Sequence, residues 1–307
     1  MDRFKIFAMM LAGAAFSLTA CDGDDSDDIS SQTIITADKV EQTPLDKWLE
    51  VNFLQPYNIE IKYRYEYNET VGDYYTVPAA YEQAVEMAHI VKYSCVEAYD
   101  EIAGIDFTRQ YFPKMFFFEG EWHYMNNGNY ELGTAEGGKK IFLLGLNYLD
   151  EYKNSLFTLN YYYLKTIHHE FTHILNQTID YPATFQLITG TGYVADSWSS
   201  DQWNSGYLQR GFISAYAQHS DAEDFAETMS MYVTNTPEQW EAWMQDAEGT
   251  EEEPSDGRQY IESKLDIVRA YMRDNFNIDL DELRDVVLRR ENDIISGKVD
   301  LSDVSID

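Results

Sequence analysis

The sequence is poor in cysteine, proline and positive charge. Its two cysteines, Cys21 and Cys95, are too few for the disulfide frameworks that hold small secreted domains together. Only 7 prolines and 17 glycines occur in 307 residues, which excludes a collagen-like or low-complexity chain. The 44% hydrophobic content is that of a globular protein with a real core. We therefore expect packing, not cross-links, to stabilise the fold.

Basic residues are outnumbered by acidic ones. The chain has 22 Lys and Arg against 54 Asp and Glu, a formal net charge of −32. A surface this acidic repels nucleic acid and anionic lipid head groups. The sequence also has no Gly-rich phosphate loop and no G-x-S-x-G nucleophile elbow. No nucleic-acid partner is expected.

Long hydrophobic runs are missing except near the start. A short basic segment precedes an apolar run at 6–18, which is too short to span a bilayer comfortably, so residues 1–20 read as a secretory signal peptide. The string LTAC at 18–21 resembles a bacterial lipobox, which implies lipidation of Cys21 and a membrane anchor. The acidic run at 22–28 resembles the export tag of some Bacteroidetes lipoproteins. An outer-membrane lipoprotein at the cell surface is expected; the alternative is that the run is only a solvated tether and the lipoprotein faces the periplasm.

Composition divides the rest of the chain into segments. Residues 21–44 are acidic and poor in aromatics, as in a flexible tether. An N-terminal lobe with a mixed sheet and helices is predicted at 45–180, and a mainly helical C-terminal lobe at 181–307. This order of elements predicts an α+β protein with two lobes. Cys95 is expected to be a buried hydrophobe.

Periodicity predicts the individual elements. Alternating residues indicate a strand at 57–67, and helical spacing indicates a helix at 78–103. Of three short strand-like runs, the one at 140–146 is apolar on both faces and should be central, whereas 130–135 should be an edge. Further predictions are a helix at 155–178, a weakly periodic stretch at 180–210, and helices at 220–296 with an acidic break at 248–257.

One short motif has the spacing of metal-binding side chains. His169-Glu170-Phe171-Thr172-His173 has the spacing H-E-x-x-H. Histidines at i and i+4 lie on one helix face, one turn apart, so their ring nitrogens can bind one zinc ion. The intervening glutamate projects beside that face and can hold a metal-bound water. The longer H-E-x-x-H-x-x-G-x-x-H pattern is excluded, because Asn176 and Ile179 stand where Gly and His are needed.

A helical wheel at 100° per residue separates this pair from the core face. His169 and His173 fall opposite an apolar arc, whereas His168 falls on it and should be a core histidine or one that supports a ligand. The arc contains Phe157, Tyr161, Leu164, Ile167, Phe171, Ile174 and Leu175.

A third ligand is expected from a second predicted helix. Glu223 and Glu227 are spaced i and i+4, so both can face the first helix. One carboxylate can complete a His₂Glu zinc set and the other can orient an imidazole. The alternative is that Ser220 and Glu223 form only a capping box. His219 and Asp224 are the fallback ligands, and Glu227 could also replace Glu223.

These motifs resemble the gluzincin metallopeptidases, particularly the anthrax lethal factor branch, through H-E-F-x-H and a later Y-x₆-E-x-F-A-E. With the lipobox and acidic tether, the chain also resembles the zinc metallohydrolase lipoproteins found beside SusC/SusD-type importers. The resemblance implies a zincin-like fold with His169, His173 and Glu223 as zinc ligands and Glu170 as base. It also implies that Tyr216 assists at the transition state and that Glu227 is the second carboxylate.

The expected function is hydrolysis of peptide bonds in a peptide or protein substrate, accessory to nutrient import. A SusC/SusD-type importer is the expected partner. One alternative is a non-catalytic nutrient-binding lipoprotein with a relict or structural zinc site, which fits the 15% aromatic content. Another is a scaffold for the importer. Glu170 favours the enzyme, because a structural site needs ligands but no base.

Overall fold

The computed structural model describes residues 41–66, 70, 72–125, 130–131, 133–136 and 140–306, with only the main chain at 131 and 133–136. The predicted signal peptide, Cys21 and nearly all of the tether lie outside the described residues. Residues from Gln42 onward form one unit. The division into lobes at residue 180 stays a prediction.

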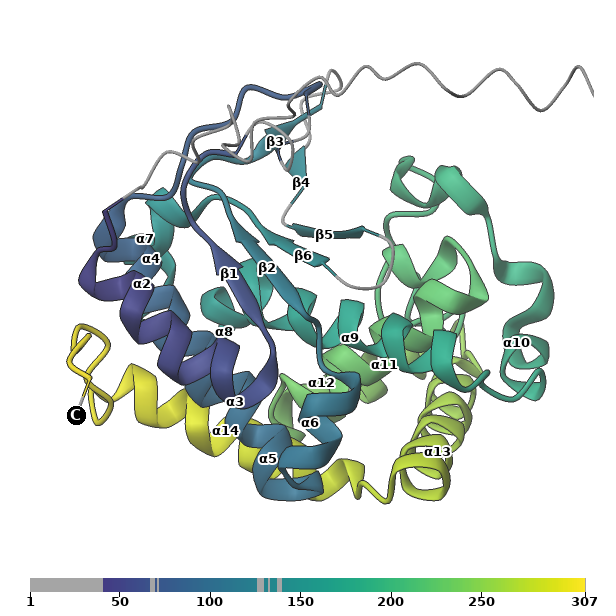
Figure 1. The fold of residues 1–307 in the computed structure, drawn as a ribbon. Helices are drawn as coiled ribbons and strands as arrows, with labels where there is room; N and C mark the ends of the chain where they lie inside the picture. Colours follow the sequence, from purple (N-terminus) through teal and green to yellow (C-terminus); the bar gives the residue numbers. More distant parts are fainter. Residues whose placement is uncertain are drawn as a thin grey trace, which may run out of the picture. The chain divides into compact units, whose positions relative to one another are not determined.

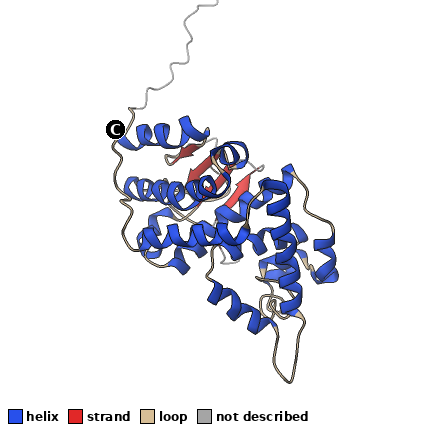
Figure 2. Ribbon diagram, turned by 90° about the horizontal axis from the view of Figure 1, so that it is seen from below, coloured by secondary structure: helices blue, strands red, loops and turns tan. Residues whose placement is uncertain are grey.

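The protein is α+β, with helices covering a small sheet (Figures 1 and 2). The strand order is β1-β2-β6-β5, in which β1, β2 and β6 are parallel and β5 is antiparallel to β6. A separate antiparallel pair joins β3 to β4. The strands are β1 Glu60–Lys62, β2 Met115–Phe118, β3 His123–Tyr124, β4 Tyr130–Glu131, β5 Gly133–Glu136 and β6 Lys140–Leu143.

Helices make up most of the described chain. The α-helices are α2 Pro44–Leu49, α3 Gln55–Tyr57, α4 Tyr81–Ile90, α5 Glu97–Ala103, α6 Ile105–Tyr111, α7 Leu149–Tyr152, α8 Leu156–Leu159, α9 Lys165–Thr178, α10 Thr184–Thr189, α11 Asp221–Val233, α12 Pro237–Ala247, α13 Gly257–Phe276 and α14 Leu280–Ile295. Short 3₁₀ turns occur at Leu146–Tyr148, Gly190–Gly192, Ala195–Ser199 and Tyr216–Gln218. π-helical turns occur at Glu50–Leu54, Val91–Val96 and Asn160–Leu164.

The sheet confirms most of the strand predictions. β6 lies between β2 and β5, so the run with two apolar faces is central. The run predicted as an edge at 130–135 is divided: residues 133–135 lie in the edge strand β5, whereas 130–131 form β4 and pair with β3. The strand predicted at 57–67 is only three residues long in β1. The alternating sequence pattern is longer than the strand. Tyr63 lies just after β1 and is buried in the core without belonging to the strand, and Tyr65 is 54% exposed.

The helix predicted at 155–178 forms in three parts, α8, a π turn and α9. The wheel is correct for Leu164, Ile167, Phe171 and Leu175, which are fully buried. It is wrong for Phe157 and Tyr161, which are 65% and 50% exposed. The π turn closes with the N–H of Lys165 donating to the carbonyl of Asn160. Its i→i+5 spacing inserts one extra residue, so residues before it no longer share the phase of α9.

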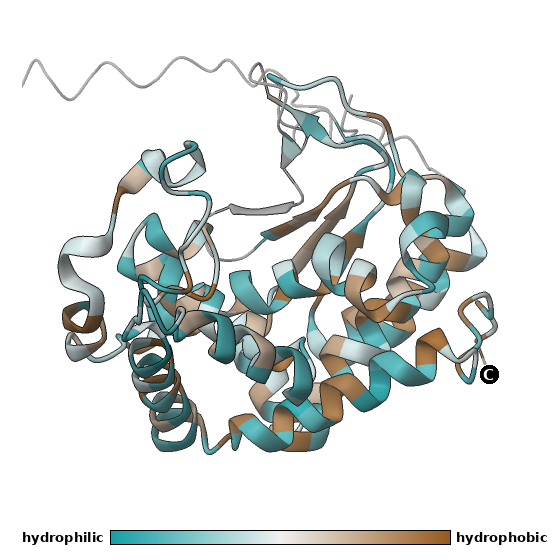
Figure 3. Ribbon diagram, turned by 180° about the vertical axis from the view of Figure 1, so that it is seen from behind, coloured by the Kyte–Doolittle hydropathy of each residue, from teal (hydrophilic) through white to brown (hydrophobic). Residues whose placement is uncertain are grey.

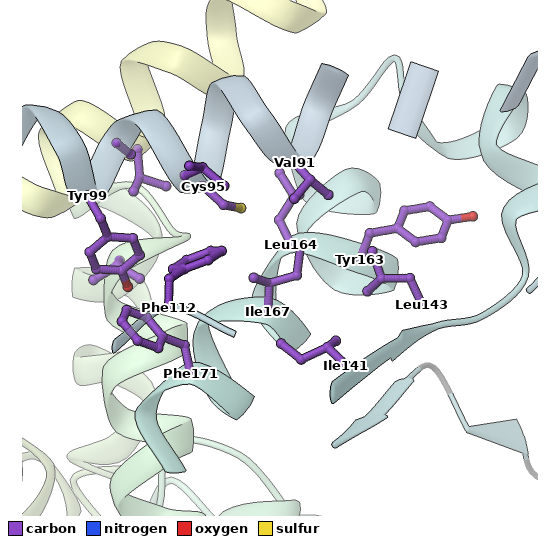
Figure 4. Close-up of a cluster of buried hydrophobic side chains, with 14 of the residues drawn as sticks. Val91, Cys95, Tyr99, Phe112, Ile141, Leu143, Tyr163, Leu164, Ile167 and Phe171 are labelled. Atoms are coloured by element: carbon purple, nitrogen blue, oxygen red, sulfur yellow. The ribbon is translucent and has the colours of Figure 1, made fainter. Parts of the chain in front are cut away.

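The buried face of α9 helps to form the core. Figure 4 shows Leu164 of the π turn and Ile167 and Phe171 of α9 grouped with Ile141 and Leu143 of β6, and with side chains of the helix from α4 to α5. Cys95 belongs to this core and is fully buried, which confirms the prediction, and burial raises the pKa of its thiol to about 12. The core therefore fixes which side of α9 faces away from the sheet.

The C-terminal half is helical with a break where the acidic segment lies, as predicted. Figure 3 shows hydrophilic and hydrophobic residues on different sides of the C-terminal helices. Buried residues such as Leu265, Val268, Leu283 and Val287 form their inner faces. Of the helices in the described part of the chain, none is both long and apolar enough to cross a membrane.

Candidate metal centre

Helix α9 places His169 and His173 side by side on the face away from the core. Their Nε2 atoms are 3.1 Å apart. His169 is 5% exposed, and the side chain of His173 is 21% exposed. The predicted i, i+4 geometry is therefore present, with one imidazole anchored inside the protein and one nearer to solvent.

Helix α11 brings a carboxylate to this pair. Figure 1 shows α11 beside α9, and Glu223 Oε2 lies 3.0 Å from His169 Nε2 and 3.2 Å from His173 Nε2. Ser220 caps α11 by accepting the N–H of Glu223 at 3.3 Å. The Glu223 side chain is turned to the histidines, so only the serine half of a capping box is present.

The three donor atoms fit a zinc ion. They form a triangle with sides of 3.0, 3.1 and 3.2 Å. Tetrahedral zinc with bonds of about 2.0–2.1 Å requires neighbouring ligand atoms about 3.3–3.4 Å apart, so small adjustments suffice. Among the described residues, His169, His173 and Glu223 are the group of metal-binding side chains that the geometry brings together. Three protein donors leave a fourth position open, as in catalytic zinc sites.

The charges around this triangle favour a cation. Burial alone would lower the pKa of His169, but Glu223 and Glu227 raise it to about 9. Burial would raise the pKa of Glu223, yet the two histidines hold it well below its usual range. The field that draws positive charge to His169 also favours a divalent cation between the three donors.

Glu227 lies on the side of His169 that faces away from the three donor atoms. It is 1% exposed, and its Oε1 lies 2.8 Å from His169 Nδ1, while Oε2 accepts a hydrogen bond from Ser214 Oγ at 2.6 Å. Lys165 donates to the same Oε1 at 2.7 Å. This is the predicted place of the second carboxylate. Sequence reasoning missed Lys165 and Ser214; the one available signal was that Lys165 lies four residues before His169.

Glu170 and Tyr216 lie next to the triangle. Glu170 follows His169 on α9, and burial raises the pKa of its carboxyl above the usual value. The ring of Tyr216 lies 6.0 Å from the ring of His169. Burial first, and then the nearby carboxylates, raise the pKa of Tyr216 well above its usual value, so the phenol keeps its proton. Both residues are near the donors.

The remaining candidates point elsewhere. His168 is fully buried in the core, where Nδ1 lies 2.9 Å from the Tyr99 hydroxyl, and burial lowers its pKa to about 4. Asp224 is fully buried and pairs with Lys264 at 2.6 Å. His219 faces Asp196 at 3.3 Å. The fallback ligands are therefore not part of the triangle.

Comparison with known proteins also indicates a zinc site. Residues 38–281 match the model of a family described as putative zinc-binding metallo-peptidase. The chain is also similar to a solved structure, described as a putative zinc-binding metallo-peptidase from Bacteroides caccae, with 36% identity and a TM-score of 0.72. The match covers 89% of this chain and 100% of that one. Among the curated proteins, nothing matches.

Proposed function

The chain belongs to this family of zinc-binding metallo-peptidases, and we propose that it hydrolyses peptide bonds with a zinc ion held by His169, His173 and Glu223. The observation that carries the proposal is the triangle of donor atoms, all within 3.2 Å of one another. The partial exposure of His173 and Glu223 supports catalysis over a purely structural role, because a substrate needs access to the metal.

The residues around the site supply the proton transfers. Bound zinc polarises a scissile carbonyl and makes a water molecule more acidic. Glu170 accepts a proton from the attacking water and passes it to the amine of the leaving peptide. Burial of its carboxyl supports this role, because a raised pKa brings a base closer to neutral pH.

Tyr216 serves as a hydrogen-bond donor. Its phenol remains protonated beside His169 and can donate to the negative oxygen that develops on the carbonyl. The edge strand β5 lies near α9 and can pair with an extended peptide through its main chain. Substrate peptides would then lie alongside the metal-binding helix.

The first experiment is the substitution Glu170→Gln. The variant should keep its zinc, because Glu170 is not among the three donors, and lose nearly all peptide hydrolysis, because glutamine cannot accept the proton. Metal analysis and cleavage of a peptide library measure the two properties. Glu252→Gln, an exposed loop position, is the matched control and should change neither. Turnover by E170Q at the wild-type rate would disprove the role of Glu170.

We also propose that the protein is a lipoprotein anchored through Cys21, on the outer membrane and at the cell surface, next to a SusC/SusD-type importer. The lipobox-like string and the acidic run after it support this location. Metabolic labelling with a palmitate analogue should mark the wild type and not Cys21→Ser. An unlabelled wild-type protein would contradict the anchor. If the importer does not co-purify with this protein, the proposed partner is wrong.

A further inference from the structure

We propose that Lys165 is a positioning residue of the metal centre, which holds Glu227 in the place where that carboxylate orients His169 toward the metal. The inference rests on the zinc site of the proposed function but not on hydrolysis. Lys165 contacts none of the three donor atoms in the hydrogen bonds and ion pairs of the described residues. Its effect therefore passes through Glu227.

One oxygen atom of Glu227 lies close to two side chains of α9. Glu227 Oε1 accepts from Lys165 Nζ at 2.7 Å and lies 2.8 Å from His169 Nδ1. Lys165 and His169 are four residues apart on α9, so they lie on the same helix face. The oxygen is held between two side chains one turn apart, and its position relative to the imidazole is set by both.

The other carboxylate oxygen of Glu227 is held by Ser214. Glu227 Oε2 accepts from Ser214 Oγ at 2.6 Å, and Ser214 Oγ accepts in turn from the N–H of Ala217 at 3.1 Å. With both oxygens engaged, the carboxylate cannot rotate freely. Loss of Lys165 would leave the hydrogen bond from Ser214 as its main anchor, and Oε1 could move away from His169.

Lys165 also contributes to the balance of charge at the site. Glu170, Glu223 and Glu227 bring three negative charges to the site, and Glu227 is almost completely buried. A divalent cation and the ammonium of Lys165 balance these three charges. A buried carboxylate without a paired cation is costly. Lys165 is thus the cation paired with the Glu227 carboxylate, which lies 2.8 Å from His169 Nδ1, on the side of the imidazole opposite the Nε2 atom that faces the metal site.

The experiment compares zinc affinity in the purified full chain, by competition with a chromophoric chelator. Lys165→Met should weaken zinc binding about tenfold to a hundredfold, the usual effect of losing support behind a metal ligand. Lys165→Arg keeps the charge and a donor to Glu227, so it should bind zinc nearly as tightly as the wild type. Should K165M not fold, Lys165→Gln removes the charge with less disturbance and should also weaken binding.

The matched control is Lys153→Met. Lys153 pairs with Glu86 at 2.5 Å, away from the metal centre and with similar exposure, so K153M should not alter zinc affinity. Melting temperatures of the zinc-free proteins separate an effect on the site from a general loss of stability. Unchanged zinc affinity in K165M overturns the inference. Equal losses in K165M and K165R also overturn it, because packing and not charge would then be responsible. His173→Ala, which removes a donor, tests the zinc site itself independently.

Discussion

Two buried glutamates, Glu227 and Glu291, show how the surroundings of a residue determine its chemistry. Burial would raise the pKa of Glu227, but Lys165 and His169 hold it well below its usual range. Glu291 is fully buried on α14, where Oε2 accepts from Asn160 Nδ2 at 2.9 Å. Its Oε1 has no hydrogen-bond partner among the described residues. Burial raises the pKa of Glu291 to about 8 in spite of the bond from Asn160.

The raised pKa of Glu291 predicts a pH dependence of stability. Between about pH 4.5 and pH 8 the folded protein keeps a proton that the unfolded chain has released. The free energy of unfolding should therefore fall as pH rises through this window, by at most about 1.4 kcal/mol per pH unit from this group. Glu291→Gln should flatten this dependence, as measured by urea unfolding from pH 5 to 8.

The same urea series with Glu252→Gln serves as the control and should retain the wild-type slope, because Glu252 is exposed. If E291Q and the wild type lose stability in parallel as pH rises, Glu291 does not keep its proton in the folded protein.

At the scale of elements, the π turn before α9 accounts for an error of the helical wheel. A wheel assumes a constant 100° per residue, and the turn at Asn160–Leu164 breaks this assumption. The buried arc of α9 itself follows the wheel because α9 is regular from Lys165 to Thr178. The phase is therefore predictable within a regular helix and not across the turn.

Helix α11 shows a second limit of local patterns. Ser220 and Glu223 have the spacing of a capping box, and the serine does cap the helix. Where the Glu223 side chain goes depends on α9, which is 50 residues or more away in the sequence and supplies both histidines. The spacing alone permitted both outcomes, and the contact between the two helices selected one.

At the scale of the whole molecule, the core does not depend on the metal centre. The buried hydrophobic cluster extends from Leu45 in α2 to Ile294 in α14. The three donors lie on the side of α9 opposite to the α9 residues that belong to this cluster. A structural zinc site, by contrast, supplies the folding energy of a small domain. The molecule should therefore keep its fold without zinc.

Removal of zinc by a chelator tests this expectation. The far-UV circular dichroism at 25 °C should stay the same, while hydrolysis is lost and the melting temperature falls. The free energy of unfolding of the zinc-free protein should be about 4 kcal/mol lower than that of the protein in the presence of free zinc at a thousand times the Kd of the site. Zinc should restore both properties. Unfolding on chelation would favour the alternative of a structural zinc site.

The sequence by itself determined those features that depend on near neighbours. The i, i+4 pair of histidines, the buried face of α9 and the central position of β6 follow from spacing and hydrophobicity over a few residues. Tertiary packing alone decided that Glu223 faces the histidines, that Asp224 turns to Lys264, and that Lys165 meets Glu227. These contacts join residues 40 to 62 positions apart, and local periodicity does not specify how two helices approach each other.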